Sequence, residues 1–319
     1  MKTFINNGLI SLFMNRKLIK QGKGGFTIYL PKKWVDNRGL KEGESIDIYE
    51  SDDFLIVGSD KKQRKEIKID ISEINKKDLK HMLTHLYRRG FDVIKLHNLD
   101  TSLISKVRKI TEALLLGFEL TEKGEDYCVL ENISEPTEQK YELLLKRSFL
   151  LIKDTIELII NDFGKYESSK ENHSLMIQQE KFVLFCRRIL NREKYIKNAL
   201  VEWELLTHLM HIEHALYYMY EYAINKKVKK DFDIIRTLIN LRDQFDLVYN
   251  AYYKKDLKFI HYNFNARKEY CFVTCFDNIE KFKGTKAGLF AHLRGVFRWV
   301  QATSSPIMSK LLQENVRES

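Results

Sequence analysis

Residues 16–60 show the alternation of hydrophobic and polar positions that is typical of β-strands. The glycine-rich run GKGG at residues 22–25 predicts a tight turn, and the apolar run FTIYLP predicts a strand that ends at Pro31. The following residues, KKWVDNRG, predict one short helical turn that closes at Gly39. This part of the chain is therefore expected to begin with a β-hairpin and a helical turn.

A second hairpin is predicted next, with the segment KEGESIDIYES as its first strand. Ile46 and Ile48 are expected to face inward, because successive side chains of a strand point to opposite faces. Asp47 and Tyr49, which alternate with them, are expected to face outward. A turn at residues 51–53 then leads into the apolar strand FLIVG.

The pattern changes over residues 63–133, where strand-like and helix-like stretches alternate. The runs KEIKIDI and DVIKLH predict strands, and the sequence around Gly124 predicts a hairpin. Helices are predicted at residues 75–89 and 102–116, because apolar residues recur there every three to four positions. These residues are Leu79, Met82, Leu83, Leu86, Ile104, Val107, Ile110 and Leu114. The order predicts a small β-α-β-α-β-β domain.

Only helical patterns follow Pro136, and proline suits the first turn of a helix. The predicted helices occupy residues 136–163, 174–191, 194–226, 230–257, 263–282 and 286–303. Pro306 is expected to end the last helix. Six helices in two sets of three indicate a duplicated architecture, although no repeat of individual residues is visible.

The whole chain is therefore expected to be a multidomain α+β protein. Residues 1–13 are interpreted as an extension, and translation from Met14 is the corresponding alternative start. Residues 14–62 are predicted to form the β domain, residues 63–133 the small α/β domain, and residues 134–319 the helical domain.

Composition supports long helices in a cytoplasmic protein. The chain has 319 residues but only 3 Pro and 14 Gly, and its 44% hydrophobic residues suffice for packed cores. No run of about 18 apolar residues is present, so no membrane span is expected. Among the four cysteines, Cys271 and Cys275 are spaced as neighbours on one helix face, which favours two buried thiols over a zinc site.

The net charge of +10 is distributed unevenly near the N-terminus. Residues 16–41 hold eight basic residues against Asp36 alone, which gives +7, whereas residues 42–60 hold seven acidic residues and no basic one, which gives −7. Clustered cations beside a glycine turn suit a polyanion such as nucleic acid, because each neutralised phosphate releases counterions. A solvated lysine-rich surface gives the same pattern and stays open as an alternative.

Residues 16–60 resemble the AbrB/MazE/SpoVT family of swapped-hairpin DNA-binding domains. The match runs over about 45 residues without a gap. The residues that carry it are Lys20, the turn from Gly22 to Gly25, Leu30-Pro31, Lys32-Lys33-Trp34 and the run GLKEGESIDI from Gly39 to Ile48.

This resemblance implies a homodimer in which two copies interleave their hairpins into one barrel, since one copy is too short to bury a core. Doubling the basic half gives about +14, and the implied partner is double-stranded DNA. Trp34 is expected to pack in the dimer core rather than to stack on a base. The residues expected to contact DNA are Arg16, Lys17, Lys20, Lys23, Lys32 and Lys33.

Residues 136–316 resemble a PhoU-type domain, which implies two three-helix bundles in tandem. The stretches that carry the resemblance are ELLLKRSFLLIKDTIELIINDF, FCRRILNREKY with ALVEWELLTHLMHIEHALYYMYEY, and GLFAHLRGVFRWVQATSSPIM. The order of a swapped-hairpin head, a small α/β domain and a PhoU-like tail resembles archaeal phosphate uptake regulators. It implies transcription regulation linked to phosphate homeostasis, with a phosphate-transport or signalling component as a further partner.

PhoU proteins carry E-x-x-x-D motifs that bind clustered metal ions, and this chain departs from that pattern. Glu213 is the one acidic residue near the first expected position, and His292, Arg294 and Arg298 stand near the second. Arginines repel a divalent cation, so the metal site of the family is not carried over. No cofactor is expected, and a divalent metal is kept only as an alternative.

Glu204, His208 and His211 are spaced at i, i+4 and i+7 on one predicted helix face, and such side chains can bind transition metals. Three ligands from one helix span about two turns, which is too far for one ion without other partners. The alternative is that these side chains are interior polar groups that form hydrogen bonds between helices.

Three well-known catalytic motifs, G-x-x-x-x-G-K-[ST], G-x-S-x-G and H-E-x-x-H, are absent, and no enzymatic activity is expected. The leading hypothesis is a DNA-binding transcriptional regulator whose helical part senses a signal or docks a partner. The alternative is an adaptor that dimerises through its N-terminal domain without binding DNA and modulates a phosphate transporter or signalling partner.

Overall fold

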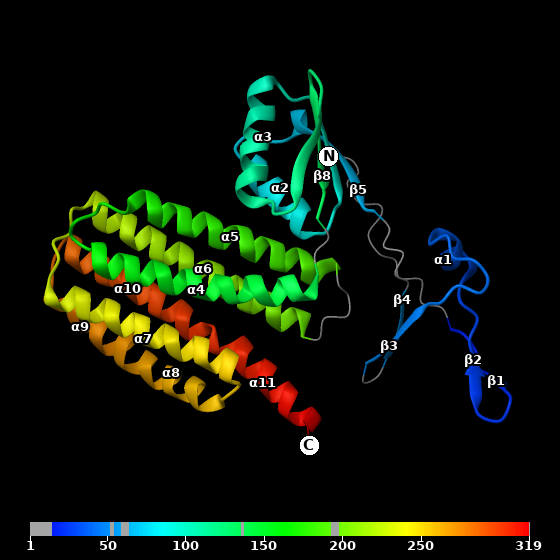
Figure 1. The fold of residues 1–319 in the computed structure, drawn as a ribbon. Coiled ribbons are helices and arrows are strands. Elements are labelled where there is room, and N and C mark those ends of the chain that lie inside the picture. Colours follow the sequence, from blue (N-terminus) through cyan, green and yellow to red (C-terminus); the bar gives the residue numbers. More distant parts are fainter. Residues whose placement is uncertain (1–14, 52–53, 59–63, 135–136, 193–197, 319) are drawn as a thin grey trace. The chain divides into compact units, whose positions relative to one another are not determined.

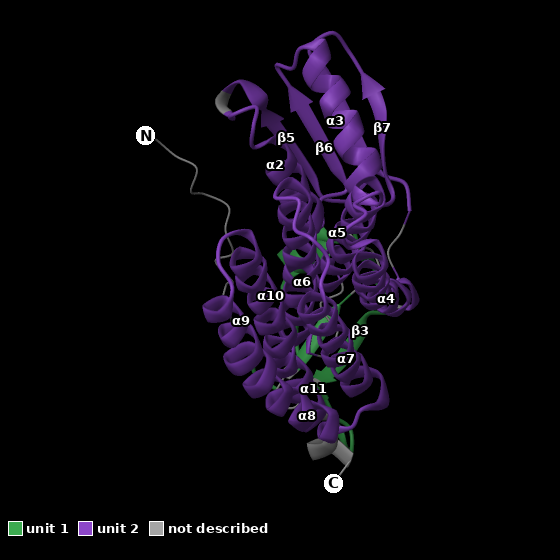
Figure 2. Cartoon of the chain, turned by 90° about the vertical axis from the view of Figure 1, so that its left-hand side faces the viewer, with its two compact units in different colours: residues 1–63 green, residues 64–319 purple. Residues whose placement is uncertain are grey.

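The computed structural model describes residues 15–51, 54–58, 64–134, 137–192 and 198–318. The predicted extension at residues 1–13 and the alternative start at Met14 lie outside this part of the chain. Internal contacts divide the chain into two units, residues 1–63 and residues 64–319, which Figure 2 colours green and purple. Unit 1 covers the segment predicted as a β domain, and unit 2 covers the α/β and helical segments.

Unit 1 contains two short antiparallel hairpins and one short helix (Figure 1). Its elements are β1 (Ile19–Gln21), β2 (Gly25–Thr27), α1 (Lys32–Asn37), β3 (Asp47–Ser51) and β4 (Phe54–Gly58). Gly22 lies in the turn after β1 with φ at 65°, a left-handed conformation that glycine adopts without strain. The strand predicted to reach Pro31 is too long, because β1 offers only three residues for β2 to pair with.

No hydrophobic side chain of unit 1 is buried among the residues whose exposure the structure describes, 15–50 and 55–58. Ile48, which was expected to face inward, is 61% exposed, so one copy does not enclose the predicted inner face. The exposed large side chains are Leu18, Ile19, Phe26, Ile28, Tyr29, Ile48, Tyr49, Leu55 and Ile56. A segment of this length is too short to cover them by itself.

The predicted β-α-β-α-β-β order is confirmed at the start of unit 2. The elements are β5 (Glu66–Asp70), α2 (Leu79–Arg88), β6 (Val93–His97), α3 (Thr101–Leu114), β7 (Phe118–Lys123) and β8 (Tyr127–Asn132). They form a four-stranded sheet in the order β5-β6-β8-β7, which is parallel between β5 and β6 and antiparallel elsewhere. Figure 1 shows α2 and α3 on one side of this sheet.

The apolar stripes of α2 and α3 supply the core of the α/β region. Their buried residues include Leu79, Leu83, Ile104 and Val107. The Asp100 carboxylate accepts a hydrogen bond from the backbone N–H of Leu103 at 2.8 Å, which caps the start of α3. Both helices also pack against α5 (Ser169–Arg192), so the α/β region and the helical region share a continuous core.

Helices form the rest of unit 2 and run as a long bundle in Figure 1. They are α4 (Glu138–Asp162), α5 (Ser169–Arg192), α6 (Ala199–Asn225), α7 (Phe232–Lys254), α8 (Leu257–Glu269), α9 (Cys275–Lys281), α10 (Thr285–Ala302) and α11 (Ser304–Glu318). The helices α4, α5 and α6 pack on one another, and α10 packs on both α6 and α7. The side chains of Cys271 and Cys275 are both buried, as their spacing predicted.

Three expectations for the bundle are wrong. Residues 258–262, which were predicted to separate two helices, belong to α8, which begins at Leu257. The helix predicted at residues 263–282 is divided by a π-helix at Tyr270–Thr274, which lies between α8 and α9. A π-helix adds a residue to one turn while the apolar pattern stays nearly helical, so the pattern does not reveal it. Pro306 does not end a helix but lies in the first turn of α11, where its missing N–H breaks no intrahelical hydrogen bond.

Candidate nucleic-acid interface

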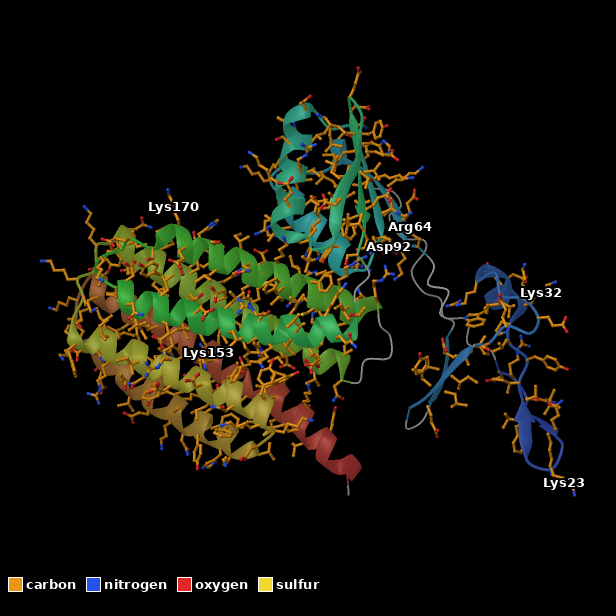
Figure 3. All side chains as sticks on the ribbon, in the orientation of Figure 1. Lys23, Lys32, Arg64, Asp92, Lys153 and Lys170 are labelled. Atoms are coloured by element: carbon orange, nitrogen blue, oxygen red, sulfur yellow. The ribbon has the colours of Figure 1, made fainter. Side chains whose placement is uncertain are left out.

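The six basic residues predicted to contact DNA are all exposed, and they come from four places in unit 1. They are Arg16 and Lys17 before β1, Lys20 within β1, Lys23 in the turn after β1, and Lys32 and Lys33 at the start of α1. Figure 3 shows Lys23 at the tip of the β1–β2 hairpin and Lys32 on α1. One copy therefore presents its cations on separate elements.

The register of the β1–β2 hairpin determines what lies beside Lys20. Lys20 pairs with Phe26, so these two side chains share one face of the hairpin. Gln21 and Thr27 lie on the other face, where the Thr27 hydroxyl donates a hydrogen bond to Gln21 Oε1 at 2.6 Å. The face of Lys20 thus combines a cation with an exposed apolar ring that a partner can cover.

The turn after β1 is open to the approach of a large molecule. Lys23 is flanked by Gly22 and Gly24, and a Cβ atom added to either glycine would meet no atom within 4 Å. The backbone N–H groups of a glycine-rich turn can approach phosphate oxygens closely because no side chain stands in between. The turn therefore offers both a cation and accessible backbone donors.

Lys32 and Lys33 begin α1, directly after Pro31. The first turn contains no acidic residue and no side-chain cap. Cations at a helix N-terminus are electrostatically unfavourable, by about 0.3–1 kcal/mol at an exposed site. Local helix stability therefore does not explain the position of these lysines.

Trp34 is partly buried, and the guanidinium of Arg38 lies 4.3 Å from the centre of its ring. This cation–π contact covers one face of the indole within a single copy. The sequence prediction that Trp34 packs in a dimer core concerns a second copy and stays a prediction.

Acidic residues occupy the second hairpin, so the charge division of the sequence follows the structural elements. Asp47 and Glu50 lie on β3, whereas Lys20 lies on β1 and Lys32 and Lys33 lie on α1. Glu44 precedes this strand and accepts a hydrogen bond from the backbone N–H of Lys41 at 2.9 Å. The basic group is thus carried by the first hairpin and α1, and the acidic group by the second hairpin.

The candidate metal residues Glu204, His208 and His211 all lie on α6, but they do not form a ligand set. No group of three His, Cys, Asp or Glu residues in the described part of the chain is arranged to hold a metal ion. The His211 ring stacks on Trp299 with centroids 4.4 Å apart, and the His208 ring lies 5.8 Å from the same indole. Burial lowers the pKa of both imidazoles.

At the first expected PhoU position the acidic residue lies inside the bundle, whereas His292 at the second is exposed. Glu213 is fully buried and accepts a hydrogen bond from the Thr155 hydroxyl at 2.8 Å. Burial raises the pKa of Glu213 to about 8, and a protonated carboxyl is a poor metal ligand. The ring of His292 packs against Tyr222 at 4.8 Å.

The chain matches no protein-family model, and comparison with curated proteins and with solved structures gives no match either. The resemblances noted from the sequence therefore stay predictions. Within the described residues, no helix has both the length and the apolar composition needed to cross a bilayer.

Proposed function

We propose that the protein is a DNA-binding transcriptional regulator that acts as a homodimer through unit 1. The observation that carries this proposal is the exposure of the apolar side chains of unit 1, with no hydrophobic residue buried among residues 15–50 and 55–58. Hairpins that leave their apolar residues at the surface need a partner surface of the same kind. A second copy supplies such a surface because it carries the same residues.

Dimerisation would also double the number of basic residues available to one DNA duplex. The six proposed contact residues are all exposed, and two of them, Lys20 and Lys23, lie on the β1–β2 hairpin. A set of twelve cations from two copies suits phosphate contacts, whose number sets the salt dependence of binding.

Unit 2 is proposed to sense a signal or to dock a partner in phosphate uptake and homeostasis. The resemblance to PhoU-type helical domains supports this part of the proposal. The alternative is an adaptor that dimerises through unit 1, binds no DNA, and modulates a phosphate-transport or signalling component. Both hypotheses predict the same dimer, and they differ in whether this dimer binds DNA.

Binding of the full-length protein to duplex DNA tests the proposal. Fluorescence anisotropy at increasing salt should show a steep fall in affinity, and Lys20→Glu with Lys23→Glu should abolish binding. Lys226→Glu with Lys229→Glu is the matched control, because both lysines are exposed in the helical part and the charge change is identical. Equal binding by both double variants would refute the proposed interface, and a dimer that ignores DNA would favour the adaptor.

A further inference from the structure

Three arginines from two helices lie near the buried thiol of Cys271, on the side of the bundle formed by α8 and α10, and this thiol lies 3.6 Å from the backbone oxygen of Arg294. Burial raises the pKa of this thiol, and the positive charges of three neighbouring guanidinium groups oppose the rise. These arginines are Arg267 on α8 and Arg294 and Arg298 on α10. Arg294 and Arg298 are four residues apart, so they are neighbours on one face of α10.

Two of these guanidinium groups are held in place by phenylalanine rings. The ring of Phe272 lies 5.1 Å from Arg267 and 5.8 Å from Arg294, so it bridges the two helices. Arg294 also lies 4.5 Å from the ring of Phe276. Stacking on an aromatic face fixes a guanidinium plane and leaves its N–H edges free to donate to a planar or tetrahedral anion.

None of the three arginines forms an ion pair with a carboxylate in the described part of the chain. The Nε–H groups of Arg267 and Arg294 are buried and lack a hydrogen-bond acceptor among the described residues. Other arginines of the bundle differ, since Arg188 pairs with Asp92 and Arg242 with Asp243. A cluster of three cations without a carboxylate partner among the described residues favours an anion from outside the chain.

A hollow beside this cluster is lined by an aromatic ring. A cavity of about 230 Å³ is bordered by Gly295, Arg298, Trp299 and Ala302. It opens beside a wider apolar hollow along α6 and α10, which Trp299 and Gly295 also border. His211 stacks on Trp299 and holds the indole in place, while 36% of Trp299 stays exposed. The small cavity is below the 300–1000 Å³ typical of drug-sized ligands, and it suits one planar base.

We propose that this face of the bundle binds a nucleotide, with its phosphate on Arg267, Arg294 and Arg298 and its base against Trp299. The arginines supply bidentate donors for phosphate oxygens, and the adjacent indole supplies a stacking surface. A divalent cation does not fit, because three positive charges without a carboxylate repel it. This proposal goes beyond DNA binding by unit 1 and does not depend on it.

Isothermal titration of the full-length protein with adenosine 5′-monophosphate tests the site, with adenosine and inorganic phosphate as separate titrants. The nucleotide should bind more tightly than either part. Arg294→Gln with Arg298→Gln should weaken nucleotide binding about tenfold or more, because two charge-assisted contacts are lost. Trp299→Leu should weaken nucleotide binding by a smaller factor and leave the weak binding of phosphate unchanged.

Arg236→Gln is the matched control, because Arg236 is an exposed arginine on α7 outside this cluster. The Arg236→Gln variant should bind the nucleotide with the affinity of the wild type. Arg298→Gln alone, at an exposed position, provides a second variant if the double variant does not fold. Absence of nucleotide binding by the wild type, or equal affinity in the arginine variants, would overturn the proposal. Phosphate binding as tightly as the nucleotide would overturn the role of Trp299.

The Lys20→Glu and Lys23→Glu variant separates this site from the DNA-binding proposal. It should lose DNA binding and keep the nucleotide affinity of the wild type, because both substitutions lie in unit 1. Loss of nucleotide binding in this variant would contradict the assignment of the site to α8 and α10.

Discussion

Arg188 of α5 donates a hydrogen bond to the carboxylate of Asp92, which precedes β6, at 2.9 Å. The same guanidinium donates to the carbonyl oxygens of Tyr87 at 2.9 Å and Phe91 at 2.7 Å. Arg188 is completely buried, and Arg192 from the next turn of α5 pairs with the same carboxylate. One acidic residue of the α/β region therefore balances two arginines of the bundle, and α5 and the α/β region behave as one structural piece.

Asp92→Asn should destabilise unit 2 by about 3–5 kcal/mol, because it leaves Arg188 buried without a countercharge. Urea unfolding followed by circular dichroism measures the loss. Glu125→Gln is the control, since Glu125 is exposed and carries the same chemical change in the same region. A loss below about 1 kcal/mol would mean that the carbonyl oxygens alone hold Arg188.

Glu213 should make stability depend on pH. Burial raises its folded-state pKa from 4.5 to about 8, so the folded protein holds this proton more tightly than the unfolded chain. Its contribution is therefore fully present below pH 4.5 and is lost as the pH rises towards 8, by up to about 4 kcal/mol. Urea unfolding at pH 5 and pH 8.5 measures this change.

Glu213→Gln should remove that part of the pH dependence and gain stability relative to the wild type as the pH rises. Glu204→Gln is the control, because Glu204 is an exposed glutamate on the same helix. The explanation fails if the wild type and Glu213→Gln show parallel stability curves between pH 5 and pH 8.5.

Glu202 fastens the C-terminal helix to the rest of the bundle. Its buried carboxylate accepts hydrogen bonds from Tyr141 at 2.7 Å, Tyr252 at 3.1 Å and Lys310 of α11 at 2.5 Å. Lys310→Met should cost about 1.5–3 kcal/mol, because it removes a charge-assisted hydrogen bond from a buried carboxylate. Hydrogen exchange should show faster exchange in α11, while Lys283→Met, at an exposed lysine, should leave it unchanged.

The exposed apolar residues of unit 1 should decide the oligomeric state. Leu55→Asp places a charge on β4 within the proposed dimer surface and should convert the dimer to a monomer in light scattering. Leu200→Asp is the control, because Leu200 is an exposed leucine on α6 outside unit 1. A Leu55→Asp protein that stays dimeric would place the dimer contact elsewhere.

Periodic sequence patterns predict the local elements of this chain well. The spacing of apolar residues that include Leu79 and Leu83 predicted α2, and the alternation in KEIKIDI predicted β5. Both predictions succeed because burial of one face of an element makes apolar residues recur at the period of that element. The π-helix at Tyr270–Thr274 was missed, since a single widened turn leaves the apolar spacing almost unchanged.

Contacts between distant residues were not predictable from the pattern. Asp92 and Arg188 are 96 positions apart, and nothing local indicates that they meet. Arg294 and Arg298 were visible in the sequence only as residues unsuited to a cation. Their association with Arg267 depends on how α8 packs against α10, which the order of residues does not specify. The six basic residues expected to contact DNA, by contrast, all lie at the surface.

The exposed apolar residues of unit 1 link the folding of this unit to the concentration of the protein in the cell. If these side chains are covered only by a second copy, unit 1 becomes ordered on dimerisation. The ordered fraction then rises with the concentration of the chain. At low concentration, unit 1 of a monomer is accessible to proteases. At high concentration, dimerisation covers the same surface. The expression level would thus determine the dimeric fraction of the protein, independently of any ligand.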